Sequence, residues 1–124
     1  MPTIYVSRNG QSFNLKLRDS QGHNPGNNNL TTDADPGNEI TWVLDTDSGL
    51  TAITGIKKSD PAIPKYKDSI EVLTGDPTLV NGVWTGFVKS PSPGKGKFQN
   101  YMIGFTVPGD TNTYWDDPKI QMKS

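Results

Sequence analysis

The sequence predicts an all-β fold, and three observations support that prediction. Eleven of the 13 acidic residues are aspartate, which favours turns and caps, whereas glutamate favours helix interiors. The chain has only three alanines but 13 threonines, a residue suited to strands. Thirteen glycines and ten prolines interrupt the chain too often for a long helix. We therefore expect a two-sheet antiparallel β-sandwich of seven to nine short strands, formed as a single domain by residues 1–124.

Alternating apolar and polar side chains indicate the strands of the N-terminal half. Asn9-Gly10 is the dipeptide best suited to a type I′ hairpin turn, and it follows a short first strand. Phe13, Leu15 and Leu17 then alternate with polar residues, as expected of a strand with one buried face. Trp42 lies in phase with its apolar neighbours, so we expect it in the core. The strands predicted here are 3–6, 13–17, 40–44 and, more weakly, 51–56 and 70–73.

The C-terminal half repeats these signals. Asn81-Gly82 is a second hairpin dipeptide and leads into an apolar segment. Residues 101–107 carry the clearest alternation of the chain, with apolar side chains at every second position. The strands predicted in this half are 83–88, 101–107 and a final strand around Ile120 and Met122.

Two segments read as surface loops rather than strands. Ser20–Asp35 is long and rich in asparagine, and Ser90–Lys97 is rich in proline, glycine and lysine. Neither is long enough to separate two domains, so we expect both to be excursions from the sandwich.

Charge and composition exclude several classes of function. The net charge is −1 and the pI is about 5.7, with scattered cations, so we expect no nucleic-acid binding. No cysteine is present, which excludes disulfides, thiolate nucleophiles and zinc–thiolate sites. We expect no membrane partner, because no apolar stretch approaches the roughly 20 residues of a spanning helix. Without a recognisable signal peptide, the chain reads as cytoplasmic, as a mature secreted form, or as exported without a visible signal.

The sequence holds no recognisable catalytic set. Its only histidine, His23, lies within the asparagine-rich loop, and no serine stands in a G-x-S-x-G context. A catalytic triad needs a nucleophile, a base and an orienting group. We therefore expect a solvated loop histidine and a protein that is not an enzyme.

Calcium is the one cofactor that the residues leave open. Asp33 and Asp35 form one pair of closely spaced carboxylates, and Asp45 and Asp47 form another. Calcium takes oxygen ligands from flexible loops. Aspartates also cap turns routinely, so the alternative is that all four are turn residues.

Two segments are candidates for a carbohydrate site. Trp115 precedes Asp116 and Asp117, and an aromatic platform beside carboxylates is typical of a sugar-binding surface. The alternative for Trp115 is a core plug at the end of a strand. Asn27 and Asn28 of the long loop also offer side-chain amides to a sugar, although the same amides suit a solvated loop or a contact between subunits.

The C-terminal third resembles a known family. Residues 101–107 (YMIGFTV), a short turn and residues 114–120 (YWDDPKI) are similar to the end of bacterial inclusion-body proteins of the PixA/AidA type. This chain departs from that pattern by one extra aspartate. The resemblance implies a non-enzymatic β-sandwich that accumulates or self-associates in bacteria, and it implies no functional residues. Residues 37–42 (GNEITW) separately resemble a strand of cupredoxin-like sandwiches, which implies a cupredoxin- or immunoglobulin-like architecture without the metal ligands.

We therefore expect a non-catalytic structural protein that self-associates into an oligomer, array or inclusion, with itself as partner. Low net charge reduces self-repulsion, and exposed edge strands offer backbone pairing to a neighbour. The alternative is a carbohydrate-binding module, with or without calcium, whose partners would be glycans. A small hydrolase built on a pair of carboxylates is a third hypothesis.

Overall fold

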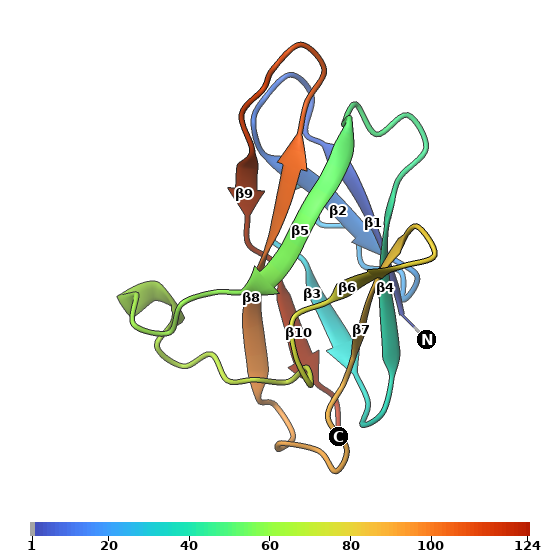
Figure 1. Ribbon diagram of the computed structural model, residues 1–124. Helices are drawn as coiled ribbons and strands as arrows, with labels where there is room; N and C mark the ends of the chain where they lie inside the picture. The colour runs from blue at the N-terminus through green and yellow to red at the C-terminus, as the bar shows by residue number, and fades with distance from the viewer. Residues whose placement is uncertain (1) are drawn as a thin grey trace.

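The computed structural model describes residues 2–124, and its regular secondary structure is almost entirely strand, which confirms the predicted all-β, sandwich-like fold (Figure 1). This part of the chain has ten strands, where seven to nine were expected, and one short 3-10 helix, η1 (Pro64–Tyr66). The strands are β1 (Thr3–Arg8), β2 (Leu15–Asp19), β3 (Thr31–Ala34), β4 (Glu39–Leu44), β5 (Ala52–Lys58), β6 (Thr78–Val80), β7 (Val83–Phe87), β8 (Phe98–Thr106), β9 (Tyr114–Asp116) and β10 (Lys119–Met122).

The strands form two five-stranded sheets. The first has the order β2-β1-β4-β7-β6, and the second has the order β3-β10-β8-β5, with β9 also paired to β8. Both sheets are mixed, because β1 pairs with β4 in parallel and β3 pairs with β10 in parallel. The expectation of purely antiparallel sheets was wrong at these two places. Between β2 and β4 the chain visits the other sheet at β3, and such a crossover lets β4 return parallel to β1.

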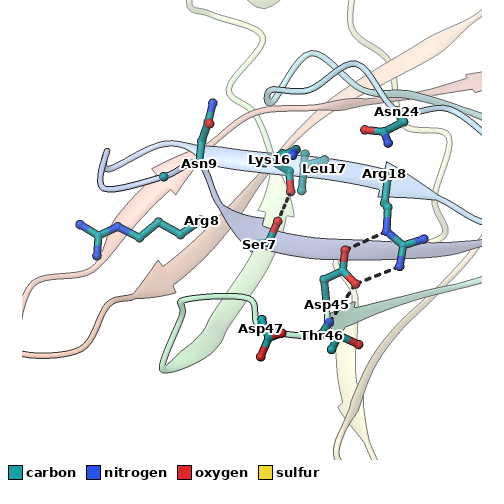
Figure 2. A pocket seen from close by; sticks show the side chains of 11 residues that line it. Ser7, Arg8, Asn9, Lys16, Leu17, Arg18, Asn24, Asp45, Thr46 and Asp47 are labelled. Atoms are coloured by element: carbon teal, nitrogen blue, oxygen red, sulfur yellow. Dashed lines mark hydrogen bonds and ion pairs between the residues drawn. The ribbon is translucent and has the colours of Figure 1, made fainter.

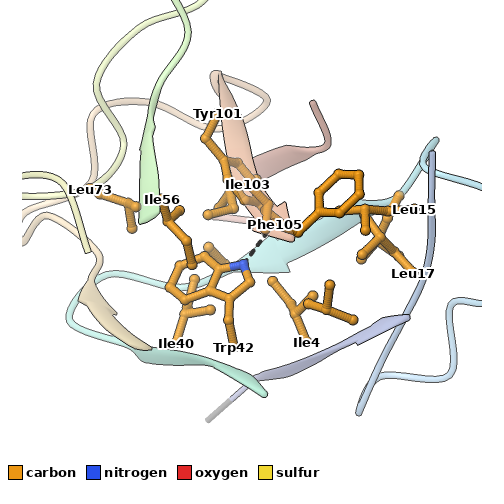
Figure 3. Close-up of a cluster of buried hydrophobic side chains, with 14 of the residues drawn as sticks. Ile4, Leu15, Leu17, Ile40, Trp42, Ile56, Leu73, Tyr101, Ile103 and Phe105 are labelled. Carbon is orange, nitrogen blue, oxygen red and sulfur yellow. Dashed lines mark hydrogen bonds between the residues drawn. The ribbon is translucent and has the colours of Figure 1, made fainter. Parts of the chain in front are cut away.

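One cluster of apolar side chains fills the space between the sheets (Figure 3). Trp42 is buried there as predicted, with 1% of its surface exposed. Its indole Nε1 donates a hydrogen bond to the hydroxyl of Tyr101 at 3.1 Å, and the two rings meet edge to face. The alternation predicted for β8 is also present, since Ile103 and Phe105 are both fully buried.

The first hairpin differs from its prediction. The segment after Asn9 turns on itself, with the Ser12 N–H donating to the Asn9 carbonyl at 3.1 Å, so β2 begins only at Leu15. Gly10 has a positive φ of 61°, but Asn9 does not, so the pair is no type I′ turn. Phe13 therefore lies outside the strand, half-exposed, and stacks on Tyr114 with ring centroids 4.6 Å apart.

Two further expectations were wrong, and one strand was not expected. Residues 70–73 form no strand beyond an isolated bridge from Leu73 to Val88, although Val72 and Leu73 are buried. Their backbone N–H groups donate instead to the side-chain oxygen of Gln99. The loop Ser20–Asp35 contains β3, whose residues TTDA show no apolar alternation. β6, another strand that no residue pattern indicated, precedes the Asn81-Gly82 turn.

No helix within residues 2–124 is long or apolar enough to cross a bilayer.

Candidate functional site

Trp115 lies on the outer face of the second sheet. Side chains alternate along β9, so Asp116 is buried while Trp115 points outward with 43% of its surface exposed. Its ring lies against Gly104, where an added Cβ would stand 2.8 Å from the indole Cη2. The ammonium of Lys57 is 4.5 Å from the ring centroid. Trp115 is therefore no core plug, and its role as a ligand platform stays a prediction.

Asp116 joins the start of β2, the asparagine-rich loop and the corner after β9. Its Oδ2 accepts a hydrogen bond from the backbone N–H of Leu15 at 2.9 Å, and its Oδ1 accepts one from the Asn28 amide. The same Oδ1 accepts the backbone N–H of Asp117 at 3.1 Å. Asn27 also serves the fold, because its Oδ1 accepts the backbone N–H of Asn29 at 2.8 Å. The buried Asp116 carboxylate thus acts as a structural link.

Asp117 points to a different surface from Asp116. Its Oδ2 lies 3.2 Å from the Lys65 Nζ and accepts a hydrogen bond from the Tyr66 hydroxyl. The hydrogen bond to this carboxylate raises the pKa of Lys65, because it favours the ammonium form. It also raises the pKa of Tyr66, because it holds the phenolic proton. Of the five predicted ligand residues, only Asn28 and Asp116 form a side-chain contact, and Trp115 faces away from both.

The pair Asp45 and Asp47 lines a pocket of about 460 Å³ on the first sheet (Figure 2). Arg18 donates to both oxygens of Asp45, from Nε at 2.8 Å and from Nη2 at 2.9 Å. This fork-shaped contact holds the pKa of Asp45 below its ordinary value. Arg8 and Lys16 line the same pocket. Three cationic side chains therefore line the same pocket as two carboxylates, and Arg18 already binds one of them, which disfavours a divalent cation.

The second aspartate pair is used in separate polar contacts. Asp33 Oδ2 lies 3.8 Å from the Nε2 of His23, and Asp35 Oδ1 accepts from the Ser124 hydroxyl at 3.1 Å. Across residues 2–124, no three histidine, aspartate or glutamate side chains are close enough together to hold a metal ion. Calcium binding at Asp33, Asp35, Asp45 or Asp47 stays a prediction.

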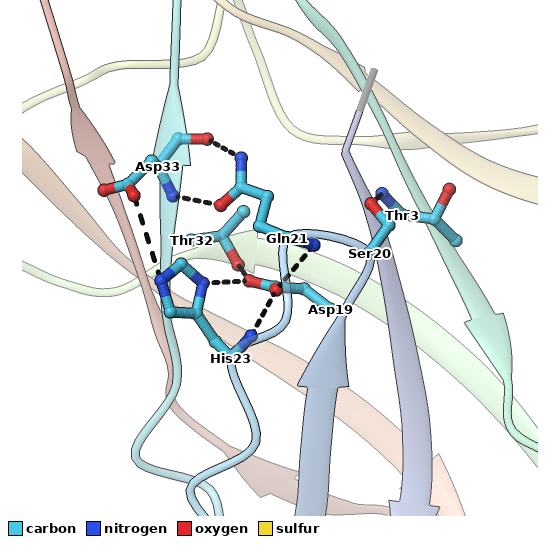
Figure 4. Close-up of polar contacts among 7 residues, drawn as sticks. All are labelled: Thr3, Asp19, Ser20, Gln21, His23, Thr32 and Asp33. Carbon is cyan, nitrogen blue, oxygen red and sulfur yellow. Dashed lines mark hydrogen bonds and ion pairs between the residues drawn. The ribbon is translucent and has the colours of Figure 1, made fainter.

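His23 is more constrained than a solvated loop histidine (Figure 4). Its Nδ1 lies 2.8 Å from the Oδ2 of Asp19, whose side chain is fully buried. Thr32 Oγ1 donates to that same Asp19 oxygen at 2.9 Å. The pair supplies two parts of a triad, but the other ring nitrogen faces Asp33 instead of a hydroxyl nucleophile. These contacts therefore hold the loop against β3.

The outer edges of the two sheets differ in how they are covered. Along β2, the N–H groups of Leu17 and Asp19 donate to carbonyls of the asparagine-rich loop at 3.0 and 3.1 Å. Along β3, the Gln21 side chain accepts from the N–H of Asp33 and donates to its carbonyl, as a neighbouring strand would. Side chains or loops thus block pairing with another chain at both edges.

The edge of β5 is partly blocked in the same way. Trp84 Nε1 donates to the carbonyl of Ile53 at 3.2 Å, and Asp76 Oδ1 accepts the N–H of Lys58 at 3.0 Å. These two side chains close the ends of the strand toward the first sheet.

The edge of β6 has no such cover. Asn81 (φ 50°) and Gly82 (φ 82°) form a two-residue turn of type I′, so Val80 and Val83 form the hydrogen-bonded pair beside it. Leu79 then belongs to a non-hydrogen-bonded pair, and its N–H and C=O point away from β7. Among the described residues, nothing else hydrogen-bonds to these two groups. β6 therefore presents an open backbone edge.

An apolar groove of about 400 Å³ adjoins this edge, between the ends of β4, β6 and β7 and the start of β5. Leu79 lines it with 57% of its surface exposed, and the partly buried Trp84 lies beside it. Leu44, at 40% exposure, extends the apolar surface. Sequence analysis missed these residues, although residues 77–88 contain no charged side chain. That charge-free stretch around a hairpin dipeptide is the signal that indicates this edge.

No family model matches this sequence, and no curated protein matches it either. The resemblance of residues 101–120 to inclusion-body proteins stays a prediction.

Proposed function

We propose that this protein is a non-catalytic assembly protein that self-associates by pairing β6 of one copy with β6 of another. The observation that supports this proposal is the uncovered backbone edge of β6, in contrast to the blocked edges of β2 and β3 and the partly blocked edge of β5. Proteins that stay monomeric cover or charge such edges. An edge that lacks both devices suits a partner strand.

Antiparallel pairing about a two-fold axis satisfies the free groups. With Leu79 of both chains at the axis, each Leu79 N–H donates to the carbonyl of the other. Residues directly opposite each other place their side chains on the same face, so the two Leu79 side chains meet over the groove. Val80 of one chain then lies opposite Thr78 of the other. Such a contact is self-complementary and closes as a dimer.

Charge and polarity around β6 favour this arrangement. No charged residue lies between Pro77 and Val88, so two copies bring no like charges together at the strand. The net charge of −1 adds little long-range repulsion. The PixA/AidA resemblance of the C-terminal third supports the same type of function. The pairing of three-residue strands buries a small area, so we expect weak, concentration-dependent association.

The first prediction is that Leu79→Pro and Leu79→Lys both weaken self-association. Sedimentation velocity over a wide concentration range measures the association of each variant. Proline removes the free N–H at no cost to the β6–β7 pairing, because that group points outward. Lysine places a charge at the axis of the dimer. We expect either change to weaken association at least tenfold, which is about 1.4 kcal/mol.

Ile63→Lys is the matched control, because Ile63 is a similarly exposed apolar residue away from β6. It should associate as the wild type does, and all variants should keep the wild-type circular dichroism spectrum. A wild-type chain that stays monomeric at the highest concentration would contradict the proposal. Unchanged association of Leu79→Pro would place the contact elsewhere.

A further inference from the structure

A polar pocket of about 310 Å³ lies on the second sheet, away from β6. Phe98 and Asn100 of β8 and Lys119 of β10 contribute from the sheet. Asn100 is directly opposite Lys119 in the β8–β10 pairing, so their side chains share a face. The remaining lining residues come from the asparagine-rich loop, the segment around η1 and the corner after β9, and they are Asn28, Asn29, Lys65, Asp68 and Asp117.

Asn100 is the unusual residue of this pocket. It is 94% buried, and its backbone is fixed by the Ser69 hydroxyl, which accepts its N–H at 2.8 Å, and by the N–H of Ser59, which donates to its carbonyl at 3.0 Å. Its side-chain amide lines the pocket yet makes no hydrogen bond to any residue of the described chain. Its amide atoms reach the solvent in the pocket, because Ser59 Oγ is the only buried side-chain polar atom without a hydrogen-bond partner among the described residues. A donor and an acceptor are therefore available inside the pocket.

Hydrogen bonds of the lining residues hold the walls of the pocket in place. The Asp117 carboxylate binds Lys65 and Tyr66, which fixes the η1 segment against the corner after β9. The Asn28 amide binds Asp116, which fixes the asparagine-rich loop. The pocket thus exists before any ligand arrives, which lowers the entropy lost on binding.

The lining indicates the class of ligand. The two lysines and two aspartates that line the pocket give it no net charge. One lysine and one aspartate, Lys65 and Asp117, already form an ion pair with each other. Amides and the Asp68 carboxylate offer both donors and acceptors, while Phe98 offers an apolar surface under Lys119. The volume lies at the lower end of ligand pockets. We propose that this pocket binds one neutral sugar residue through its hydroxyl groups, independently of self-association at β6.

The second prediction concerns this site. The labelled full-length chain is screened on an array of neutral and acidic glycans, and the best neutral glycan is titrated by NMR and calorimetry. We expect the side-chain amide signals of Asn100 to shift, with those signals identified by their loss in Asn100→Leu. Asn100→Leu and Asp68→Ala should each weaken binding at least tenfold. Asp68 is exposed, so its removal leaves the fold intact.

Two controls locate the site. Trp115→Ala should bind as the wild type does, because Trp115 is not among the residues that line this pocket. Leu79→Pro should also bind normally, which separates sugar binding from assembly. Absence of any neutral glycan ligand would overturn the proposal, as would a preference for acidic glycans. Loss of binding in Trp115→Ala with full binding in Asp68→Ala would move the site to the Trp115 surface.

Discussion

The contact between Trp42 and Tyr101 joins the two sheets at the centre of the core. Trp42 belongs to β4 in the first sheet and Tyr101 to β8 in the second, and both are at least 99% buried. Their 3.1 Å hydrogen bond satisfies an indole N–H that water cannot reach. The phenol is kept neutral, because burial raises the pKa of Tyr101 well above its ordinary value.

The third prediction is that Tyr101→Phe lowers the free energy of unfolding by about 1–3 kcal/mol, because it leaves the buried Trp42 N–H without an acceptor. Urea unfolding at neutral pH measures the change. Tyr5→Phe is the control, since Tyr5 is partly exposed and its hydroxyl makes no hydrogen bond within residues 2–124. Equal stability of the two variants would show that the Trp42–Tyr101 bond contributes little.

At the scale of elements, the hairpin of β6 and β7 depends on two residues in the left-handed region. Asn81 and Gly82 both have positive φ, which matches the twist of the flanking strands. The fourth prediction is that Gly82→Ala costs about 1–2 kcal/mol, because a Cβ is strained at φ 82°. Gly75→Ala is the control, with an ordinary φ and no atom within 4 Å of the added Cβ. Thermal melts compare the two variants.

Some elements of the fold could be predicted from the sequence, and others could not. Trp42 and the alternation of β8 were predictable, because local period-two patterns report a buried face directly. The shape of the turn after Asn9 was not predictable, because Phe13 stacks on Tyr114, a residue far away in the sequence. β3 has no apolar pattern of its own and exists through its pairing with β10. Local sequence does not carry pairings between remote segments.

The sequence also did not show how the fold uses the predicted ligand residues. Asp116 looked available in sequence, yet the fold uses its oxygens to join three segments. Asp45 looked like a calcium ligand, but Arg18, from a different strand, occupies its carboxylate. Conversely, Asn100 carries no motif, and only the arrangement of β8, β10 and η1 reveals its amide inside a pocket.

For the whole molecule, the groups with shifted pKa values predict that the free energy of unfolding is constant between acid and alkaline pH and falls on either side. The pKa values of Asp45 and Asp110 are lowered, by hydrogen bonds from Arg18 and Tyr114. Their contributions are complete above the ordinary value of 3.8 and are lost as pH falls through the lower folded values. The pKa values of Tyr66, Tyr101 and Tyr114 are raised, so stability falls as pH rises beyond 10.0.

The fifth prediction follows from that pH dependence. Asp45→Asn should make the free energy of unfolding fall less steeply at acid pH, because it removes a carboxyl group whose pKa is lowered in the folded state. The decline at alkaline pH should stay unchanged, because the tyrosines with raised pKa values remain. Urea unfolding across the pH range measures both declines. A decline at acid pH as steep as that of the wild type would show that the Arg18 contact contributes no pH-dependent stability.

The position of β10 in the second sheet has a consequence for how this protein is made. Within residues 2–124, β3 pairs only with β10, and β10 in turn joins it to β8. During synthesis, β3 therefore emerges from the ribosome long before β10, and it has no strand to pair with until β10 has also emerged. Assembly of that sheet waits on contacts between segments far apart in sequence, which slows folding and leaves the apolar interior open to chaperones in the meantime.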